Sequence, residues 1–408
     1  MEHQNKFALF SLAFIPLVMT LGNSMLIPIL PTIEKELNLS ELQVSMIITL
    51  FSVVAIIFIP IAGFISDRYG RKIVIIPSLL IAAIGGAVAG WASSQLEDPF
   101  TWILIGRIIQ GLGSAGAAPV VLPLIGDMYK DDKQISEGLG VVESFNTFGK
   151  VLSPILGSLL AVLVWFMPFF AIPVFSVAAA ILVLFFVKVP KQNNTDKRKI
   201  KEFVSSVKEI AVREGKWLVA IFMMGIFSMF ILFGVLFFLS EQLESEYGMK
   251  GVIKGLVLAI PLLSLSIASY ITGKKVGDNK RLMKVIIAAG LILVTINLGW
   301  IGFSEGIYTL LTGLFLAGLG IGIALPALDA MITEGIEKEE CGTVTSIYSS
   351  MRYVGVALGP PIVAATLNTG REIIFFGMMG LSVIANIIVF VLIRPEKEEK
   401  NELEPAKV

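Results

Sequence analysis

Residues 63–76 read GFISDRYGRKIVII, and long apolar runs lie on both sides of this stretch. Its charged residues are Asp67, Arg68, Arg71 and Lys72. An apolar chain keeps several bases together where a loop must stay on the cytoplasmic side of a membrane. The stretch therefore predicts a short turn between two membrane-spanning helices.

The composition also indicates a membrane protein. Of the 408 residues, 55% are hydrophobic and only 16% are charged, whereas about a quarter are charged in soluble domains. The formal net charge is zero, which argues against a nucleic-acid partner because phosphate binding needs a basic excess. We expect the lipid bilayer to cover most of the surface.

Twelve apolar runs are long enough to cross a bilayer, for which a helix needs ~20 residues. They form two groups of six on either side of a polar stretch. The first group is predicted at 7–30, 44–65, 73–91, 100–128, 136–162 and 165–188, and the second at 216–239, 252–273, 282–302, 307–331, 342–367 and 372–393. The expected fold class is an all-α membrane protein.

The positions of lysine and arginine predict the orientation of these spans. With the N-terminus inside, Lys35, Lys250, Lys254 and Arg371 are the only ones of the 32 bases in or beside the outer loops, and three fall deep within spans. The other 25 lie on the cytoplasmic side. Both termini are therefore predicted to be cytoplasmic.

The chain divides into a six-helix bundle at 1–188, a cytoplasmic linker at 189–215, and a second bundle with a charged tail at 216–408. In the linker, apolar residues recur every three to four positions among lysines, which suits an amphipathic helix at the membrane surface. A solvated charged segment is the alternative, and both interpretations stay open.

The two halves also resemble each other. GLGSAGAAP at 111–119 aligns with GLGIGIALP at 318–326, and FGKVLSPILGSLLA at 148–161 parallels VGVALGPPIVAATL at 354–367. Such repeats are typical of secondary transporters, which bind a small molecule near the bilayer midplane between the repeats. We therefore expect a small-molecule substrate.

Other classes of function lack their signatures in the sequence. His3 and Cys341 are the only histidine and cysteine, which excludes a Cys/His metal cluster. There is no HExxH, no GxSxG and no GxxxxGK[ST] loop, so neither an enzyme nor an ATP-driven pump is expected. We expect no metal and no cofactor.

On these features the chain resembles the major facilitator superfamily, in particular its twelve-helix drug:proton antiporter branch. The resemblance implies two pseudo-symmetric six-helix bundles and a monomer in the bacterial cell membrane. The stretches that carry it are LGNSMLIPILP at 21–31, GFISDRYGRK at 63–72, LIGRIIQGLGSAG at 104–116, and GKVLSPILGS at 149–158 with Ser153 and Ser158 where glycines are usual.

Part of the 63–72 stretch is explained by turn geometry and orientation. Gly63 and Gly70 permit close backbone approach and a tight turn between two helices. Arg68 and its basic neighbours hold the loop on the cytoplasmic side. On this interpretation the loop serves only to set the orientation of the chain.

The acidic residue of the stretch has no place in that interpretation. The resemblance implies that Asp67 and Arg71 form a latch at the cytoplasmic gate, which holds the outward-facing state and breaks when the halves move. In this latch Arg71 pairs with Asp127, and Asp67 faces the positive start of the helix at 342–367.

Five charged residues fall inside predicted spans and away from the outermost residues of those spans; an ionisable group at mid-bilayer costs roughly 2.5–3.5 kcal/mol and marks a functional site by default. They are Arg107, Glu143, Lys150, Asp329 and Arg352. The resemblance assigns Arg107 to proton coupling, in which it would act on Glu143 or Asp329. A partly desolvated carboxylate can exchange its proton as access alternates. The alternatives are a buried ion pair of Glu143 with Arg107 or Lys150, and a helix-end cap for Asp329.

Lys150 and Arg352 lie at similar depth on repeat-related helices that the resemblance places at the cavity. Central cations suit an anionic or zwitterionic substrate better than a lipophilic cation, unless the two carboxylates neutralise them. Both interpretations stay open. Asn23 and Asn146 are further candidates for the cavity wall, since buried amides either bind substrate or join helices.

The predicted function is proton-coupled export of small amphiphilic compounds or drugs by alternating access, as in multidrug efflux and antibiotic resistance. One alternative is export of an anionic or zwitterionic metabolite, such as a siderophore or a lipid-like compound. Another is an uptake facilitator with the same fold.

Overall fold

The computed structural model describes residues 2–129, 132–188, 209, 213, 215–276, 279–336 and 338–393. Every regular element within these ranges is a helix, which confirms the all-α prediction. The linker segment considered as an amphipathic helix lies almost entirely outside the described residues. Its structure and the division of the chain around it therefore stay predictions.

The helices extend beyond most of the predicted spans. A 29-residue helix such as α3 measures roughly 43 Å, which exceeds the ~30 Å hydrocarbon core. The first group is α1 (Glu2–Ser24), η1 (Ile27–Ile29), α2 (Leu30–Leu37), α3 (Glu41–Tyr69), α4 (Arg71–Gln95), α5 (Phe100–Met128), α6 (Asp132–Leu163) and α7 (Met167–Phe186). The second is α9 (Gly215–Ser245), α10 (Gly251–Lys275), α11 (Lys280–Phe303), α12 (Ile307–Gly335), α13 (Lys338–Thr366), η2 (Leu367–Thr369) and α14 (Arg371–Leu392).

The first span differs from its prediction because it is broken near the outer end. α1 stops at Ser24, and the short helices η1 and α2 carry the span on to Leu37. Pro28 and Pro31 stand within the first turns of η1 and α2. Proline has no N–H to donate, so it suits the start of a helix and interrupts its interior.

The turn predicted at the charged hairpin is confirmed. α3 ends at Tyr69 and α4 begins at Arg71, so that Gly70 alone connects them. Gly70 has a φ of 108°, in the region that favours glycine because it has no Cβ.

All twelve predicted spans form helices, although only eleven of them meet criteria of length and hydropathy within the described residues. The twelfth is α13, which packs between α3 and α9. Its cytoplasmic half carries hydroxyl side chains and Arg352, and several of these line a cavity and face away from lipid. The low hydropathy of α13 thus follows from its position beside the cavity.

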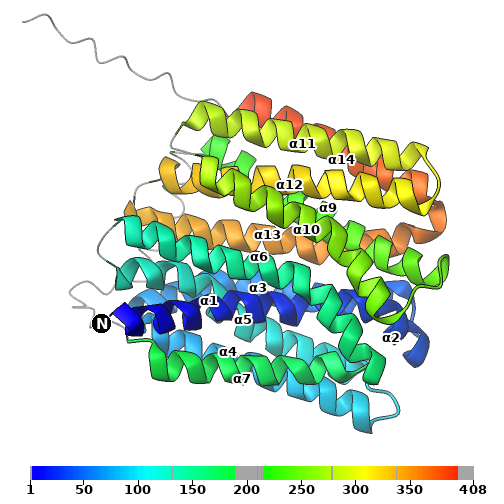
Figure 1. Ribbon diagram of the computed structural model, residues 1–408, viewed down its shortest axis with the longest axis horizontal. Helices are drawn as coiled ribbons and strands as arrows, with labels where there is room; N and C mark the ends of the chain where they lie inside the picture. The colour runs from blue at the N-terminus through cyan, green and yellow to red at the C-terminus, as the bar shows by residue number, and fades with distance from the viewer. Residues whose placement is uncertain are drawn as a thin grey trace, which may run out of the picture.

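The packing of the first half is repeated in the second. α1 packs on α6 and α7 as α9 packs on α13 and α14, and α5 packs on α3 and α4 as α12 packs on α10 and α11. The aligned glycines make equivalent contacts: a Cβ on Gly111 would meet the carbonyl of Phe51, and one on Gly318 that of Pro261. Figure 1 shows the blue-to-green half below the lime-to-red half.

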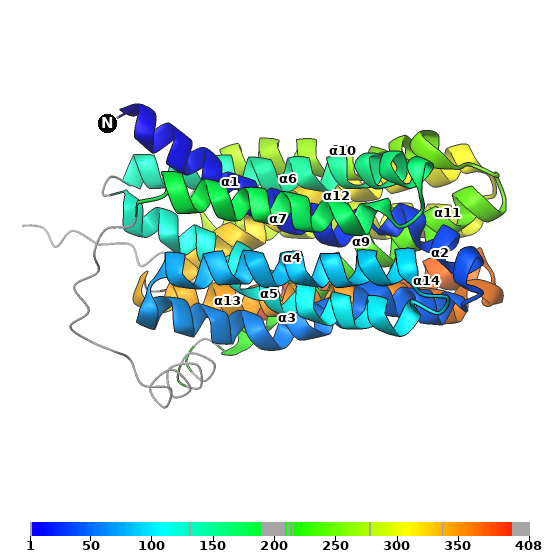
Figure 2. The same cartoon turned by 90° about the horizontal axis from the view of Figure 1, so that it is seen from below.

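The two halves meet along two pairs of helices, α3 with α13 and α6 with α10. Seen from below in Figure 2, α3, α4, α5 and α13 lie in one layer, and α1, α6, α7 and α10 lie in the other. Each interface therefore joins one helix from each half within a layer, which leaves room for a site between the layers.

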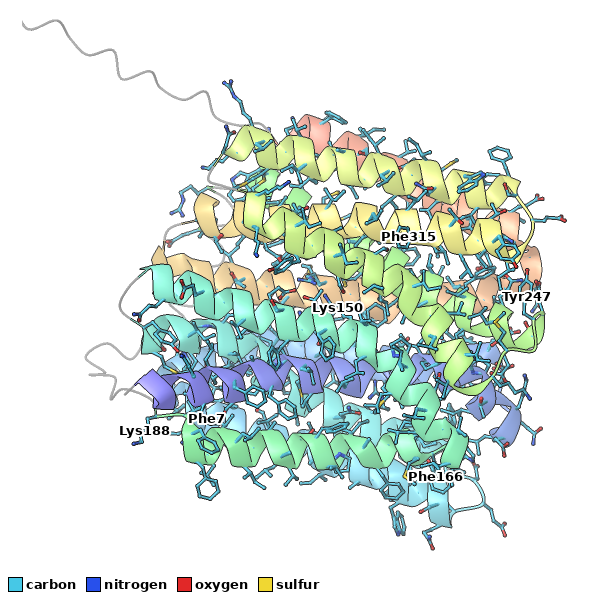
Figure 3. The ribbon with its side chains drawn as sticks, viewed as in Figure 1. Phe7, Lys150, Phe166, Lys188, Tyr247 and Phe315 are labelled. Carbon is cyan, nitrogen blue, oxygen red and sulfur yellow. The ribbon has the colours of Figure 1, made fainter. Side chains whose placement is uncertain are left out.

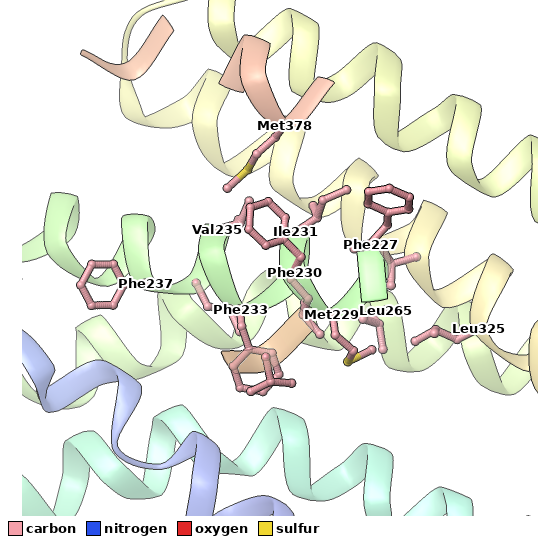
Figure 4. Close-up of a cluster of buried hydrophobic side chains, with 14 of the residues drawn as sticks. Phe227, Met229, Phe230, Ile231, Phe233, Val235, Phe237, Leu265, Leu325 and Met378 are labelled. Atoms are coloured by element: carbon pink, nitrogen blue, oxygen red, sulfur yellow. The ribbon is translucent and has the colours of Figure 1, made fainter. Parts of the chain in front are cut away.

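The apolar centre of the second half is α9. Its buried side chains include Phe227, Phe230 and Phe233, which lie among residues of α10, α12 and α14 (Figure 4). Its burial on nearly all sides explains why its sequence is apolar almost throughout.

Candidate functional site

A cavity of about 290 Å³ lies between the two halves. Its walls come from α1, α5 and α6 of the first half and from α9, α10, α12 and α13 of the second. Glu143 and Thr333, toward the cytoplasmic ends of α6 and α12, are exposed to solvent. At the outer end η1 and α2 pack against α9, and residues 25–30 and 236–240 are buried. The cavity is thus accessible from the cytoplasm and closed toward the outside.

Lys150 lies near the middle of the molecule and lines this cavity (Figure 3). Its ammonium forms no ion pair or hydrogen bond with any residue in the described ranges. Arg352 differs, because its Nη1 lies 3.8 Å from Oδ1 of Asp329, and its guanidinium lies 5.7 Å from the ring centre of Tyr348. A carboxylate therefore neutralises Arg352 by contact, whereas Lys150 remains available to a ligand.

Glu143 faces the cavity on α6, one turn before Asn146. The Asn146 amide nitrogen lies 3.2 Å and 3.3 Å from the two carboxylate oxygens. The amide oxygen accepts a hydrogen bond from Thr20 of α1 at 2.7 Å. In the described part of the chain, Glu143 forms no ion pair with Arg107 or Lys150, so the buried pair considered as an alternative is not present.

Arg107, which the resemblance assigns to proton coupling, lies in α5. It is fully buried and donates to the backbone oxygens of Ile47 at 2.8 Å and Gly22 at 3.0 Å, and to Asn23 at 2.8 Å. It also contacts Gln110, and its charge lies 4.4 Å from the ring centre of Phe51.

These contacts join three helices of the first half. Arg107 makes no ion pair within the ranges that the structure describes, so its direct action on Glu143 or Asp329 is not observed. Asn23 holds Arg107 and also lines the cavity, so it links this buried junction to the site.

Arg107→Ala is expected to destabilise the fold by more than about 2 kcal/mol, because it leaves several buried acceptors without a donor. The melting temperature of the purified protein in detergent measures this effect. Arg281→Ala, which removes an exposed arginine from the start of α11, is the matched control. An unchanged melting temperature for Arg107→Ala would show that the junction contributes nothing to stability.

The charged hairpin forms a compact ionic cluster. Arg71 contacts Asp67, and its Nε lies 3.1 Å from Asp127. Its Nη1 also donates to Ser66 at 2.9 Å. The guanidinium of Arg68 lies 5.5 Å from the ring centre of Tyr69.

The contact of Arg71 with Asp127 lies within the first half, because it joins α4 to α5. Their contact is present in this state, in which the cavity faces the cytoplasm, and its part in a latch stays a prediction. Contact with the second half is made by Gly63, at which a Cβ would lie 3.1 Å from Ser346 of α13. The side chains at the start of α13 lie outside the described residues, and the latch role of Asp67 stays a prediction.

Two features of the structure were not predicted from the sequence. Tyr348 on the cavity wall is buried, and its hydroxyl makes no hydrogen bond of normal geometry with the residues that the structure describes. Lys254, expected in an outer loop, is 2% exposed in α10 and pairs with Glu244 at 2.8 Å. The amino-acid sequence gives no sign of burial at a residue so close to a helix start.

Comparison with known proteins identifies the family. The sequence model of the Major Facilitator Superfamily matches residues 12–360 and 284–408. The chain is 52% identical, over 96% of its length and 98% of the relative's, to the bacillibactin exporter of Bacillus subtilis (strain 168). It is 26% identical, over 90% of its length and 91% of the relative's, to the class E tetracycline resistance protein of Escherichia coli.

Two solved structures are similar in fold. The human organic anion transporter MFSD10 (TETRAN) has a TM-score of 0.75 at 17% identity, over 94% of this chain and 99% of that one. A bacterial homologue of the human lysosomal transporter Spinster, in an inward-facing and unoccupied conformation, has the same TM-score at 14% identity, over 97% and 98%. Sequence and fold agree, and the chain belongs to the Major Facilitator Superfamily of multi-pass membrane transporters.

Proposed function

We propose that this transporter exports a siderophore from the cytoplasm by alternating access. The observation that carries the proposal is the ammonium of Lys150, which has no ion pair or hydrogen bond among the described residues and lines a cavity that reaches the cytoplasm. Identity of 52% to a bacillibactin exporter over nearly the whole chain supports a siderophore rather than a drug, since the quinolone and class E tetracycline resistance proteins match at 22% and 26%.

The cavity has a polar part and an apolar part. A siderophore is a small iron chelator, and some of its ligating oxygens carry negative charge. Lys150 and Arg352 can donate charge-assisted hydrogen bonds to such oxygens. Leu232, Phe233 and Leu236 of α9 line the outer end and can contact the apolar part of the substrate. An amphiphilic anion thus fits better than a lipophilic cation.

Proton exchange at a cavity carboxylate is the proposed driving reaction. Glu143 is favoured over Asp329 because the partner of its carboxylate is a neutral amide. Protonation of Glu143 therefore leaves no basic side chain without a counter-charge. A proton on Asp329 would leave Arg352 without its counter-charge. Arg107 holds the helices that carry the cavity wall.

The test is transport into inside-out membrane vesicles that carry the protein. With an acidified lumen, iron-free radiolabelled bacillibactin should accumulate about tenfold above the level reached after a protonophore is added. A lipophilic cation such as tetraphenylphosphonium should not accumulate. Vesicles without the protein are the control, and accumulation of the cation without the siderophore would establish drug efflux instead.

A further inference from the structure

The outer end of the molecule holds a buried carboxylate that the transport proposal does not use. Oε1 of Glu244 lies 2.9 Å from Nζ of Lys35, and Oε2 lies 2.8 Å from Nζ of Lys254. The Glu244 and Lys254 side chains are 3% and 2% exposed, whereas that of Lys35 is 56% exposed. One carboxylate thus binds two lysines, one buried and one partly in water.

The two lysines belong to different halves of the transporter. Lys35 lies on α2 of the first half, whereas Glu244 and Lys254 lie on α9 and α10 of the second. Beside them Ser240 of α9 donates to the backbone oxygen of Ile27 in η1 at 2.9 Å. The outer end is therefore closed by polar contacts between the halves.

The two arms of the cluster respond differently when the outer end opens. Separation of α2 from α9 breaks the Lys35–Glu244 contact and moves Lys35 fully into water, where its charge is hydrated. Glu244 keeps Lys254, so that no buried charge loses its partner, which would be costly. The cluster can thus open and close without leaving an uncompensated buried charge.

We propose that Lys35 and Glu244 form the outer gate of the transporter, and that Lys254 positions Glu244 for this contact. The gate contact favours the state in which the cavity faces the cytoplasm, and its loss favours outward opening. Glu34, Glu41 and Glu241 are the other charged groups near the cluster. The proposal rests on alternating access and holds whatever the substrate is.

The distance between the outer ends of α2 and α9 tests this gate. Spin labels at Glu36→Cys and Ser245→Cys, both exposed positions, report the distance by pulsed electron paramagnetic resonance. The only native cysteine is replaced by Cys341→Ser. In Lys35→Ala the population with the longer distance should increase about two- to fivefold, as expected for a partly exposed ion pair.

Lys250→Ala is the matched control, because it removes an exposed lysine from the same outer surface and should leave the distances unchanged. Glu244→Gln alone leaves the buried ammonium of Lys254 without a counter-charge and risks misfolding. The second variant is therefore the double substitution Glu244→Gln with Lys254→Met.

This pair should widen the outer end as Lys35→Ala does. Adding Lys35→Ala to it should then have no further effect. The gate assignment is overturned if Lys35→Ala leaves the distances as they are in Lys250→Ala. It is also overturned if Lys35→Ala still widens the distances by the same factor once Glu244 and Lys254 are neutral.

Discussion

Lys150→Ala is expected to lower kcat/KM for bacillibactin export by about ten- to a hundredfold. The ammonium of Lys150 is free of ion pairs in the described ranges, so a bound anion gains its interaction without displacing a protein carboxylate. A hydrogen bond to a charged group contributes about 1.5–3 kcal/mol, which corresponds to this range of rates. Initial rates of uptake into acidified inside-out vesicles measure the loss.

Two further lysine variants separate charge from packing. Lys150→Met keeps the length and the apolar stem of the side chain, so it should be as defective as Lys150→Ala. Lys284→Ala should transport normally, because Lys284 donates to the backbone oxygen of Phe390 at 3.0 Å outside the cavity. If Lys150→Met exports bacillibactin at the rate of the unaltered protein, the charge of Lys150 does not bind the substrate.

The fold was predictable because its main constraints are local in sequence. Apolar runs of bilayer length, basic loops and the repeat of Gly111 at Gly318 follow from the chain alone. The break after Ser24 was harder to predict, since Pro28 and Pro31 are compatible with either a bent helix or two helices. α13 was predicted from the run at 342–367 between clusters of charged and turn residues, although its hydropathy is low.

The candidate site was predictable as a set of residues and less so as a set of contacts. Charges at mid-bilayer depth drew attention to Lys150 and Arg352, and both line the cavity. Which carboxylate meets which base depends on the rotation and separation of helices from different halves. Arg107 shows this limit, because two of its partners are backbone oxygens, and no residue pattern records where a carbonyl of another helix lies.

Glu143→Gln is expected to abolish uphill export while downhill movement of substrate persists. The Glu143 carboxylate can accept a hydrogen bond from a substrate hydroxyl, since its only described partner is the amide of Asn146. An iron-free chelator keeps protons on some of its ligating oxygens, because metal binding is what releases them. A proton on Glu143 removes an acceptor, so that proton and substrate exclude each other.

The sign of the pH dependence follows from this exclusion. Binding of iron-free bacillibactin to the purified protein should weaken as the medium is acidified, and this dependence on pH should be reduced in Glu143→Gln. Asp329→Asn is the comparison, because it removes the carboxylate beside Arg352 and leaves Glu143 in place. If binding strengthens on acidification, attraction between the bound anion and the proton dominates. Proton and substrate would then bind together, and the membrane potential, at about 2.3 kcal/mol per charge and 100 mV, would have to drive the export of an anion.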